Sequence, residues 1–572
     1  MKSILYIVMT SFWLLMAGCQ NSLDLYPLAQ PSAEKWYSNE SEILLALNDL
    51  YRPDWWTPDE SIGGEVLSDD AFSRTTLSPI KAGTTNSQWA TSTLLWRNSY
   101  KAIARANRAL VALDNPVTKA SVPQAKLATY VAELRFHRAA QYARLITYFG
   151  DVVYSDGVIS IEEAYTKGRT DRKTVLAKVY ADYDAAVADL PKTYAASTVK
   201  RVTKGAALAL KARLALYMGD FKIAAEAAKA CIDLAEYSLH PTYASLFVQN
   251  TKNSREVVFG LPRSIALNVS IASSNVLDRL TRNAGGFAAV APTWDLLCSY
   301  LCTDGLVIDK SPLFDPRNPF KNRDPRCAAT IVEFGTTHLG FQYDPNPTAL
   351  RVLRVSNNSQ VTNNDNRANA QFASFTGLVW KKGIDETWLQ NGNRVEPDQI
   401  VVRYADVLLM YAEAKMELNE IDKSVLDAVN TVRARAYVVA PTATTAYPSV
   451  TTTNQRDLRK AIRQERRMEL ANEGLRYMDL VRWRLAGKVL SRPIYGMLDP
   501  NELKAKLVDK NLWFFPSTPS IDEDGVADFK PMFDAGLIKL IVPTGWTNQQ
   551  YLWPIPAAEI QINANMKQNE GY

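Results

Sequence analysis

Carboxylates are the residues of this sequence best suited to acid–base chemistry. Asp69 and Asp70 are adjacent, and Glu465, Glu469 and Glu473 recur every four residues. Two acids that flank a glycosidic bond, about 5 Å or about 6.5 to 9.5 Å apart, are sufficient for glycoside hydrolysis. A glycoside hydrolase that uses carboxylates alone is therefore the enzymatic alternative to be weighed.

The surroundings of these acids favour structural roles over catalysis. The three glutamates alternate with arginines, among them Arg466 and Arg467, and acids and bases three or four residues apart pair along a helix. Asp69 and Asp70 point in different directions on most backbones, which suits hydrogen bonds to sugar hydroxyls or a turn. We therefore expect no catalytic residues and no enzymatic activity.

Other chemistries lack the residues that they need. His137, His240 and His338 are isolated in the sequence, which leaves little material for a Ser-His-Asp triad or a histidine metal site. The sequence also has no glycine-rich phosphate loop. Its 65 basic and 60 acidic residues are interspersed, without the basic patch of a nucleic-acid-binding protein. We expect no cofactor, no metal and no nucleic-acid partner.

Aromatic residues point instead to ligand binding. The chain has 13 Trp and 26 Tyr, and many lie in segments without helical periodicity. Flat aromatic faces pack on the C–H patches of sugar rings, while nearby Asp, Asn and Arg side chains bind the hydroxyl groups. Ordinary loop packing is the alternative for each ring, and the Trp-x-x-x-Tyr spacing that begins at Trp96 would suit a core position. By location, the candidate glycan-binding residues are Asp69, Asp70, Trp89, Trp96, Asn98, Phe287, Tyr343, Arg367 and Trp388.

Pairs of helices are the elements that must position these residues. Between 202 and 236, apolar residues recur at helical spacing on both sides of a break at Gly219, which predicts a helix hairpin like one tetratricopeptide unit. At least three such units are enough to bury a continuous core. Similar pairs are predicted for 130–149 with 173–190 and for 404–418 with 423–436, and a further helix is predicted for 457–483.

Long segments without sustained periodicity separate these helices. They are rich in Pro, Asn, Thr and Gly, and they are longer than simple connections need to be. Loops on a rigid scaffold often carry binding residues. We therefore expect an all-α dominated scaffold of tetratricopeptide-like helix pairs, with the ligand site in irregular insertions. These insertions cover about 55–96, 254–292, 309–393 and 492–553.

The amino-terminal segment has the features of an export signal. Lys2 precedes an apolar run from Ile4 to Ala17, which is shorter than the about 20 residues of a transmembrane helix. The run ends in Met-Ala-Gly followed by Cys19, which resembles the lipobox of bacterial lipoproteins. An ordinary signal peptide that contains a Cys is the alternative. We expect residues 1–18 to be removed and Cys19 to carry a lipid that anchors the protein to a membrane.

The remaining cysteines are Cys231, Cys298, Cys302 and Cys327, which are too sparse for a disulfide scaffold. A helical spacing of four aims Cys298 and Cys302 poorly at each other. Buried free thiols, or one bridge to Cys327, are the two interpretations that remain.

Several motifs resemble, in order along the chain, the signature segments of the SusD/RagB family of nutrient-binding lipoproteins. The resemblance covers nearly the whole chain, with weaker matches at 133–136 and 322–326. The motifs are RYADVLLMYAEA at 403–414, ERRMEL at 465–470, EGLRY at 473–477, DLVRW at 479–483, YLWPIP at 551–556 and QNEGY at 568–572.

This resemblance implies a fold, a location and a function. It implies one SusD-like domain over residues 19–572, held at the outer membrane by the lipid and facing the cell exterior. The protein would capture an oligosaccharide and deliver it to a SusC-like TonB-dependent transporter. One branch of the family resembles peptide receptors, so an oligopeptide-binding lipoprotein of the RagB type is the alternative. A cleft with exposed Trp favours sugar, and a polar cleft with few exposed Trp favours peptide.

The shared motifs themselves are expected to be structural. Their charged residues have the density and spacing of a network that fixes helix packing, and the Trp-Pro-Ile-Pro segment that begins at Trp553 is expected to hold the carboxyl-terminal segment in place. The predicted network comprises Arg403, Asp406, Glu413, Arg466, Arg467 and Glu469.

Overall fold

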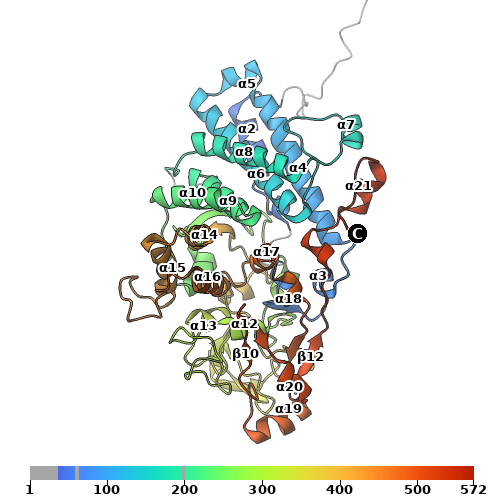
Figure 1. Ribbon diagram of the computed structural model, residues 1–572. Helices are drawn as coiled ribbons and strands as arrows, with labels where there is room; N and C mark the ends of the chain where they lie inside the picture. The colour runs from blue at the N-terminus through green and yellow to red at the C-terminus, as the bar shows by residue number, and fades with distance from the viewer. Residues whose placement is uncertain (1–35, 58–63, 196–199) are drawn as a thin grey trace, which may run out of the picture.

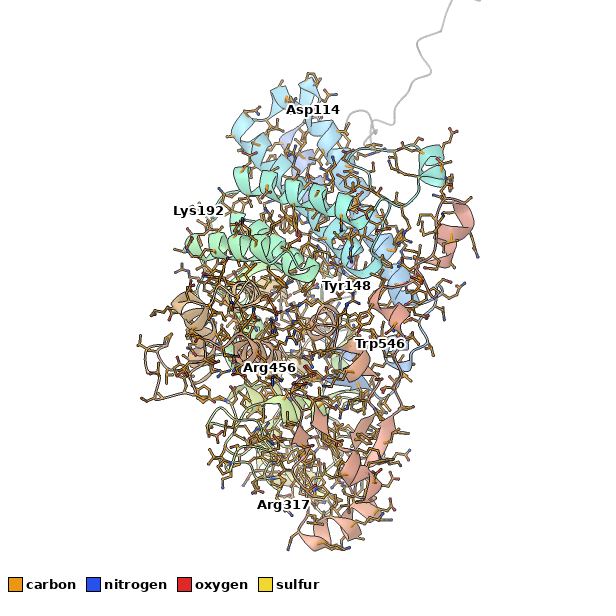
Figure 2. The ribbon with its side chains drawn as sticks, viewed as in Figure 1. Asp114, Tyr148, Lys192, Arg317, Arg456 and Trp546 are labelled. Carbon is orange, nitrogen blue, oxygen red and sulfur yellow. The ribbon has the colours of Figure 1, made fainter. Side chains whose placement is uncertain are left out.

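The computed structural model describes residues 36–57, 64–195 and 200–572. The first long helices gather at one end of the molecule, and loop-rich segments with short strands gather at the other (Figure 1). Asp114 lies near the helical end and Arg317 near the loop-rich end (Figure 2). The predicted signal peptide and Cys19 lie outside the described residues. Within the described ranges, no helix is both long and apolar enough to cross a membrane.

The predicted helix hairpin is present as α9 (Lys204–Met218) and α10 (Phe221–Asp233). The hydroxyl of Thr203 caps the amino end of α9, which satisfies a backbone N–H that has no partner within the helix. Gly219 ends α9 with a φ of 82°, a left-handed conformation that glycine adopts without steric cost. Ala224 on α10 is fully buried, and such a small side chain suits the close packing of α10 on its neighbouring helices.

The other predicted helix pairs are present as well. Helix α6 (Gln124–Phe149) packs on α8 (Arg172–Asp189), and α14 (Tyr404–Glu417) packs on α15 (Lys423–Ala436). Helix α10 also packs on α14, which joins the pairs into a continuous scaffold. The structure thus confirms the predicted all-α dominated, tetratricopeptide-like scaffold.

The first long helix begins earlier than the sequence suggested. Helix α4 spans Ala90–Leu113, so Trp96 and Asn98 lie inside a helix and not in an irregular insertion. Ser92 and Ser99 are buried on its inner face, and these polar residues obscure the apolar periodicity that would have revealed the helix.

The predicted helix over 457–483 is broken into two. Helix α16 covers Gln455–Glu469 and α17 covers Arg476–Arg482. Between them, Asn472 and Gly474 have φ angles of 61° and 72°, and these two residue types enter the left-handed region most readily. The break lets the N–H of Gly474 donate to the carboxylate of Glu65 at 2.8 Å.

The glutamates of α16 lie in a buried charge network. The carboxylate of Glu469 accepts hydrogen bonds from Arg403 at 2.6 Å, from Arg326 at 2.9 Å and from Arg435. Burial favours the neutral acid, but the three guanidinium groups hold the pKa of Glu469 below its usual value. This carboxylate has no open face and joins four segments of the scaffold.

A second part of the same network links α14, α16 and α17. Arg466 donates to Asp406 at 2.9 Å and to Asp479 at 3.0 Å. Arg482 donates to both carboxylate oxygens of Glu413, at 2.6 and 2.7 Å. The network predicted from the shared motifs is therefore confirmed, and it fixes how the three helices pack.

Short strands form small antiparallel sheets in the loop-rich part. Two ribbons bear on the site: β1 (Ala71–Ser73) pairs with β3 (Val290–Pro292), and β2 (Val257–Leu261) pairs with β8 (Gln399–Arg403). A third ribbon pairs β9 (Ile494–Gly496) with β12 (Lys539–Val542). A four-stranded sheet contains, in order, β4 (Thr337–His338), β5 (Phe341–Gln342), β6 (Arg351–Arg354) and β7 (Ser359–Thr362).

The main apolar core runs through the helical scaffold and includes the closing motif of the sequence. Trp553 is 1% exposed, and its ring lies 4.5 Å from that of Trp89 and 4.4 Å from that of Tyr148, measured between centroids. Its indole N–H donates to the hydroxyl of Tyr477 at 3.1 Å. These contacts hold the carboxyl-terminal segment in place, as predicted.

The four cysteines in the described ranges, Cys231, Cys298, Cys302 and Cys327, are buried and free. This confirms the interpretation as free thiols. The predicted alternative, a bridge to Cys327, is wrong. Burial raises the pKa of the Cys327 thiol to about 12, which keeps it protonated and unreactive.

Candidate functional site

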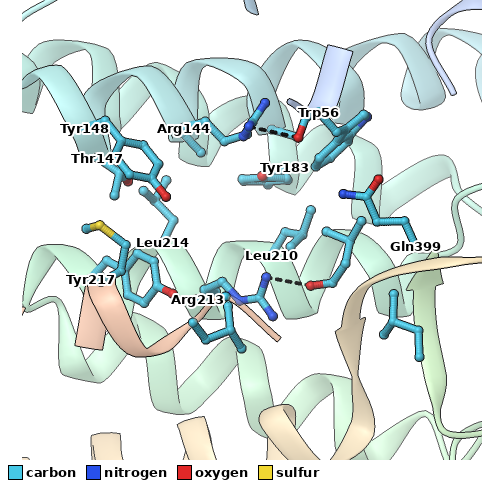
Figure 3. Close-up of a pocket in the computed structure, with 17 residues that line it drawn as sticks. Trp56, Arg144, Thr147, Tyr148, Tyr183, Leu210, Arg213, Leu214, Tyr217 and Gln399 are labelled. Carbon is cyan, nitrogen blue, oxygen red and sulfur yellow. Dashed lines mark hydrogen bonds between the residues drawn. The ribbon is translucent and has the colours of Figure 1, made fainter. Parts of the chain in front are cut away.

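A small cavity between α6, α9 and β8 is too small to hold a sugar (Figure 3). Its volume is about 70 Å³, whereas ligand pockets are typically on the order of 300 to 1,000 Å³. Its guanidinium groups are engaged, since Arg144 donates to the carbonyl of Trp56 at 3.1 Å and Arg213 to that of Val401 at 2.7 Å. The cavity belongs to the packing of the scaffold.

A larger groove lies where two of the predicted insertions meet. We call it the insertion groove. It has a volume of about 890 Å³ and is lined by residues within 52–57, 66–79, 89–94 and 263–275, together with Val290. Its size fits a bound oligosaccharide or peptide segment.

Three structural elements shape the walls of the insertion groove. The amide of Asn98 on α4 donates to the carbonyl of Asp54 and to the hydroxyl of Thr57, both at 2.7 Å, which holds the short helix η1 (Pro53–Trp56). The β1–β3 ribbon places Ser73 opposite Val290. A hairpin-like turn closed by hydrogen bonds between Ser264 and Val269 at 2.7 and 2.9 Å forms the third wall.

The lining of the insertion groove combines uncharged hydrogen-bonding groups with apolar surface. Thr76, Asn268 and Asn275 are exposed, and Leu77 is 42% exposed. Charges are few, and Asp54 is paired with a neighbouring guanidinium, that of Arg52, at 3.3 Å. Such a surface can hydrogen-bond to hydroxyl or amide groups and cover an apolar face.

The structure places Asp69 and Asp70 inside the protein. Arg467 donates to Asp69 at 2.8 Å and to Asp70 at 2.5 Å, and Arg476 donates to Asp69 at 2.9 Å. Burial opposes ionisation of Asp69, but the two guanidinium groups hold its pKa below the usual range. Through these ion pairs, both residues connect the β1 segment to α16 and α17. Their carboxylates are buried, so they cannot make the predicted contacts with a sugar.

The predicted tryptophan platforms are also interior. Trp96 is 3% exposed, with its ring 5.0 Å from that of Phe149, and Trp388 is 6% exposed. Trp89 lines the insertion groove at its edge but is 8% exposed and packs on Trp553. No Trp in the described ranges is among the large exposed apolar side chains, and the three predicted platforms pack in the interior.

The candidates in the later insertions divide in the same way. Tyr343 is 2% exposed, and its hydroxyl donates to the carbonyl of Gly377 at 2.9 Å. Arg367 is paired with Asp499 at 2.9 Å. Phe287, by contrast, is 46% exposed and follows the turn that leads into β3. It is the predicted aromatic candidate that presents an open face.

Several surface residues near the groove escaped the sequence analysis. The side chains of Thr76, Leu77 and Asn275 line the groove, and Arg74 lies beside the exposed ring of Phe372. All five lie inside predicted insertions, but single residues in a loop without periodicity carry no signal that separates a lining residue from its neighbours.

A second groove of about 1210 Å³ lies among the ends of α6, α9, α14 and α17 and the segments 547–552 and 569–571. We call it the scaffold groove. Charged groups dominate it, including Arg172, Lys173, Glu417 and Arg463. It is built from helices and shared motifs, whereas the insertion groove is built largely from the predicted insertions.

Comparison with known protein families accounts for most of the chain. The model of the SusD family matches residues 253–572, and a model described as "Starch-binding associating with outer membrane" matches residues 43–216. Among curated proteins, SusD-like protein P25 of Formosa agariphila is 24% identical over 516 residues, covering 85% of this chain and 90% of that protein.

Solved structures agree. A SusD-like carbohydrate binding protein from Bacteroides fragilis is 30% identical and superposes with a TM-score of 0.76. The match covers 93% of this chain and 100% of that chain. A laminarin binding SusD-like protein shares the fold at 20% identity and a TM-score of 0.64, over 93% of this chain and 100% of that chain. With the helix pairs, the buried motif network and the pinned carboxyl-terminal segment, these matches show that the chain belongs to the SusD family.

Proposed function

We propose that the protein binds an oligosaccharide in the insertion groove. The observation that carries this proposal is the groove itself, which is large enough for several sugar rings and lined by Thr76, Asn268 and Asn275 beside the exposed Leu77. Membership of the SusD family and the printed names of the similar structures, one carbohydrate binding and one laminarin binding, support a glycan as ligand.

We propose that this binding occurs without hydrolysis. The acids singled out from the sequence are engaged by arginines: Asp69 by Arg467 and Arg476, and Glu469 by three guanidinium groups. A general acid or nucleophile must reach the glycosidic bond. None of these carboxylates lines the insertion groove.

A paired substitution tests the groove. Leu77→Ala with Asn275→Ala removes an apolar contact and a hydrogen-bonding side chain, so we expect glycan affinity to fall by roughly tenfold. Calorimetric titration with the glycan identified on an array measures the change. Leu350→Ala is the matched control, because Leu350 is 50% exposed and lies outside the groove. Equal affinity of the double variant and the control would contradict the proposed site.

An oligopeptide is the second candidate ligand. It is favoured by one observation, namely that the described part of the chain exposes no tryptophan platform at the groove. A peptide library screened beside the glycan array decides between the two. Peptide binding that is lost in the double variant, with no glycan bound, would establish the RagB-type alternative.

We further propose that a lipid on Cys19 anchors the protein at the outer membrane, facing the exterior, and that the bound ligand passes to a SusC-like TonB-dependent transporter. The apolar run before Cys19 supports the anchor. The description of the matched model, which names association with the outer membrane, supports the location.

A further inference from the structure

A cluster of two arginines and two exposed aromatic rings lies beside the β1–β3 ribbon. Arg74 follows β1, and its guanidinium donates to the carbonyl of Phe287 at 3.1 Å. The same guanidinium lies 5.2 Å from the centroid of the Phe372 ring. Phe287 is 46% exposed and Phe372 is 49% exposed, so one cation lies over one open ring and is bonded to the backbone of the residue that carries the other.

Arg282 supplies a second positive charge at this place. Its backbone N–H and that of Asn283 donate to the carboxylate of Asp365, at 2.6 and 3.2 Å, which fixes the turn that carries it. Burial and the positive charge of Arg282 both lower the pKa of Arg74, and Asp278 opposes them in part. The N–H of Gly286 donates to the carbonyl of Thr281 at 2.9 Å, so the turn that carries Arg282 ends next to Phe287, whose carbonyl accepts from Arg74. The two positive charges therefore oppose each other at this place.

Arg74 and Arg282 are half-buried and lack the carboxylate partner that other arginines of the protein have. Arg367, for example, is matched to Asp499 at 2.9 Å. Among the residues that the structure describes, no carboxylate lies within ion-pair distance of Arg74 or Arg282, and the Nε atom of each is buried without a hydrogen-bond partner. Two acids act on them through space: Asp278 acts on Arg74, and Asp365, whose carboxylate accepts hydrogen bonds from two backbone N–H groups, interacts with Arg282.

We propose that Arg74 and Arg282 bind the carboxylate or sulfate group of an acidic sugar whose ring packs on Phe287 and Phe372. Guanidinium groups bind such anions in a bidentate manner, and an anion relieves the repulsion between two of them. The cluster adjoins the insertion groove, because Ser73 and Val290 line that groove and belong to the same ribbon. This inference rests on the proposed glycan binding and narrows it to acidic glycans.

The test compares acidic polysaccharides with their neutral counterparts. For carboxylate groups, polygalacturonate is compared with its neutral methyl ester. For sulfate groups, κ-carrageenan is compared with neutral agarose. Affinity electrophoresis measures binding to these four polymers and to a wider panel of polysaccharides. We expect the wild-type protein to bind acidic members better than their neutral counterparts. Arg282→Gln should weaken the acidic interaction by roughly tenfold to a hundredfold and leave neutral binding unchanged.

Arg354→Gln is the matched control, because Arg354 is an exposed cation 5.4 Å from the ring of Phe341 on a different sheet. Phe372→Ala should weaken acidic and neutral binding alike, which separates stacking from charge. Binding of neutral polymers alone, or an Arg282→Gln variant with unchanged acidic affinity, overturns the acidic subsite. Absence of binding to every glycan would instead overturn the proposed function.

Discussion

Aromatic side chains in this protein serve two purposes that depend on what surrounds each ring. Trp96 and Trp553 are almost fully buried and meet other rings at 4.4 to 6.4 Å. Phe287 and Phe372 keep about half of their surface in solvent, next to a guanidinium group. The first kind stabilises the fold, and the second kind is available to a ligand.

Trp96→Ala should therefore destabilise the protein without acting on ligand contacts. The change removes the ring that packs on Phe149 and Tyr100, and such a loss in a core costs roughly 3 to 5 kcal/mol of unfolding free energy. Denaturant unfolding measures it. Phe287→Ala is the exposed control and should lose much less stability. A stable Trp96→Ala variant with impaired glycan binding would return Trp96 to the ligand site.

The residues of the insertion groove mark the limit of sequence interpretation at this scale. Two of the four predicted insertions do meet at the groove. The individual predictions favoured large aromatic and acidic residues, whereas the exposed lining includes Thr76, Leu77 and Asn275. Small polar residues are common in all loops, and only the folded backbone shows which of them share a surface.

Helices α14, α16 and α17 depend on one another through charges that water does not reach. Asp406 on α14 accepts hydrogen bonds from Arg213 at 2.6 Å and from Arg466 at 2.9 Å. Burial would raise its pKa, but these guanidinium groups lower it to about 2. The ionised form is therefore the one that the folded state prefers.

The sign of the resulting pH dependence follows from this pKa. The folded value of about 2 lies below the ordinary value near 3.9, so Asp406 contributes stability above about pH 4 and loses it as the pH falls through about 2. The contribution is roughly 2 to 3 kcal/mol at neutral pH. Asp406→Asn should lower stability at pH 7 and flatten the loss between about pH 4 and pH 2.

Urea unfolding at a series of pH values measures both effects. Asp233→Asn is the control, because Asp233 forms an exposed ion pair with Lys229 one helical turn away, and such pairs contribute little. An Asp406→Asn variant as stable as this control at pH 7 would show that the buried pairs of Asp406 are not stabilising.

Elements differed in how well the sequence predicted them. The helix pairs were recovered because their apolar residues repeat at the helical period, and Gly219 marks the turn in one of them. The break after Glu469 was missed, since Asn472 and Gly474 interrupt the helix without interrupting its charge pattern. The strands of the insertions are two to five residues long, too short for a period of two to emerge.

At the scale of the whole molecule, the two grooves differ in the segments that line them. The insertion groove is lined largely by loops, and the scaffold groove by helix ends and family motifs.

If Cys19 tethers the chain, Cys19→Ala should move the protein from the membrane fraction to the soluble fraction and abolish incorporation of labelled fatty acid. Cys231→Ala, at a buried free thiol, should change neither. Continued membrane association and labelling of the Cys19→Ala protein would rule out the anchor.

The contact between Trp89 and Trp553 also dictates an order of events during synthesis. A ribosome adds roughly 5 to 20 residues per second, so Trp553 is made about 20 to 90 s after Trp89. From the synthesis of Phe149 until that of Trp553, the side chains of Trp89, Tyr148 and Phe149 have no indole to pack against. The helical half of the chain therefore lacks part of its core until the carboxyl-terminal segment is present, and the unfilled site is an apolar surface that a chaperone can bind.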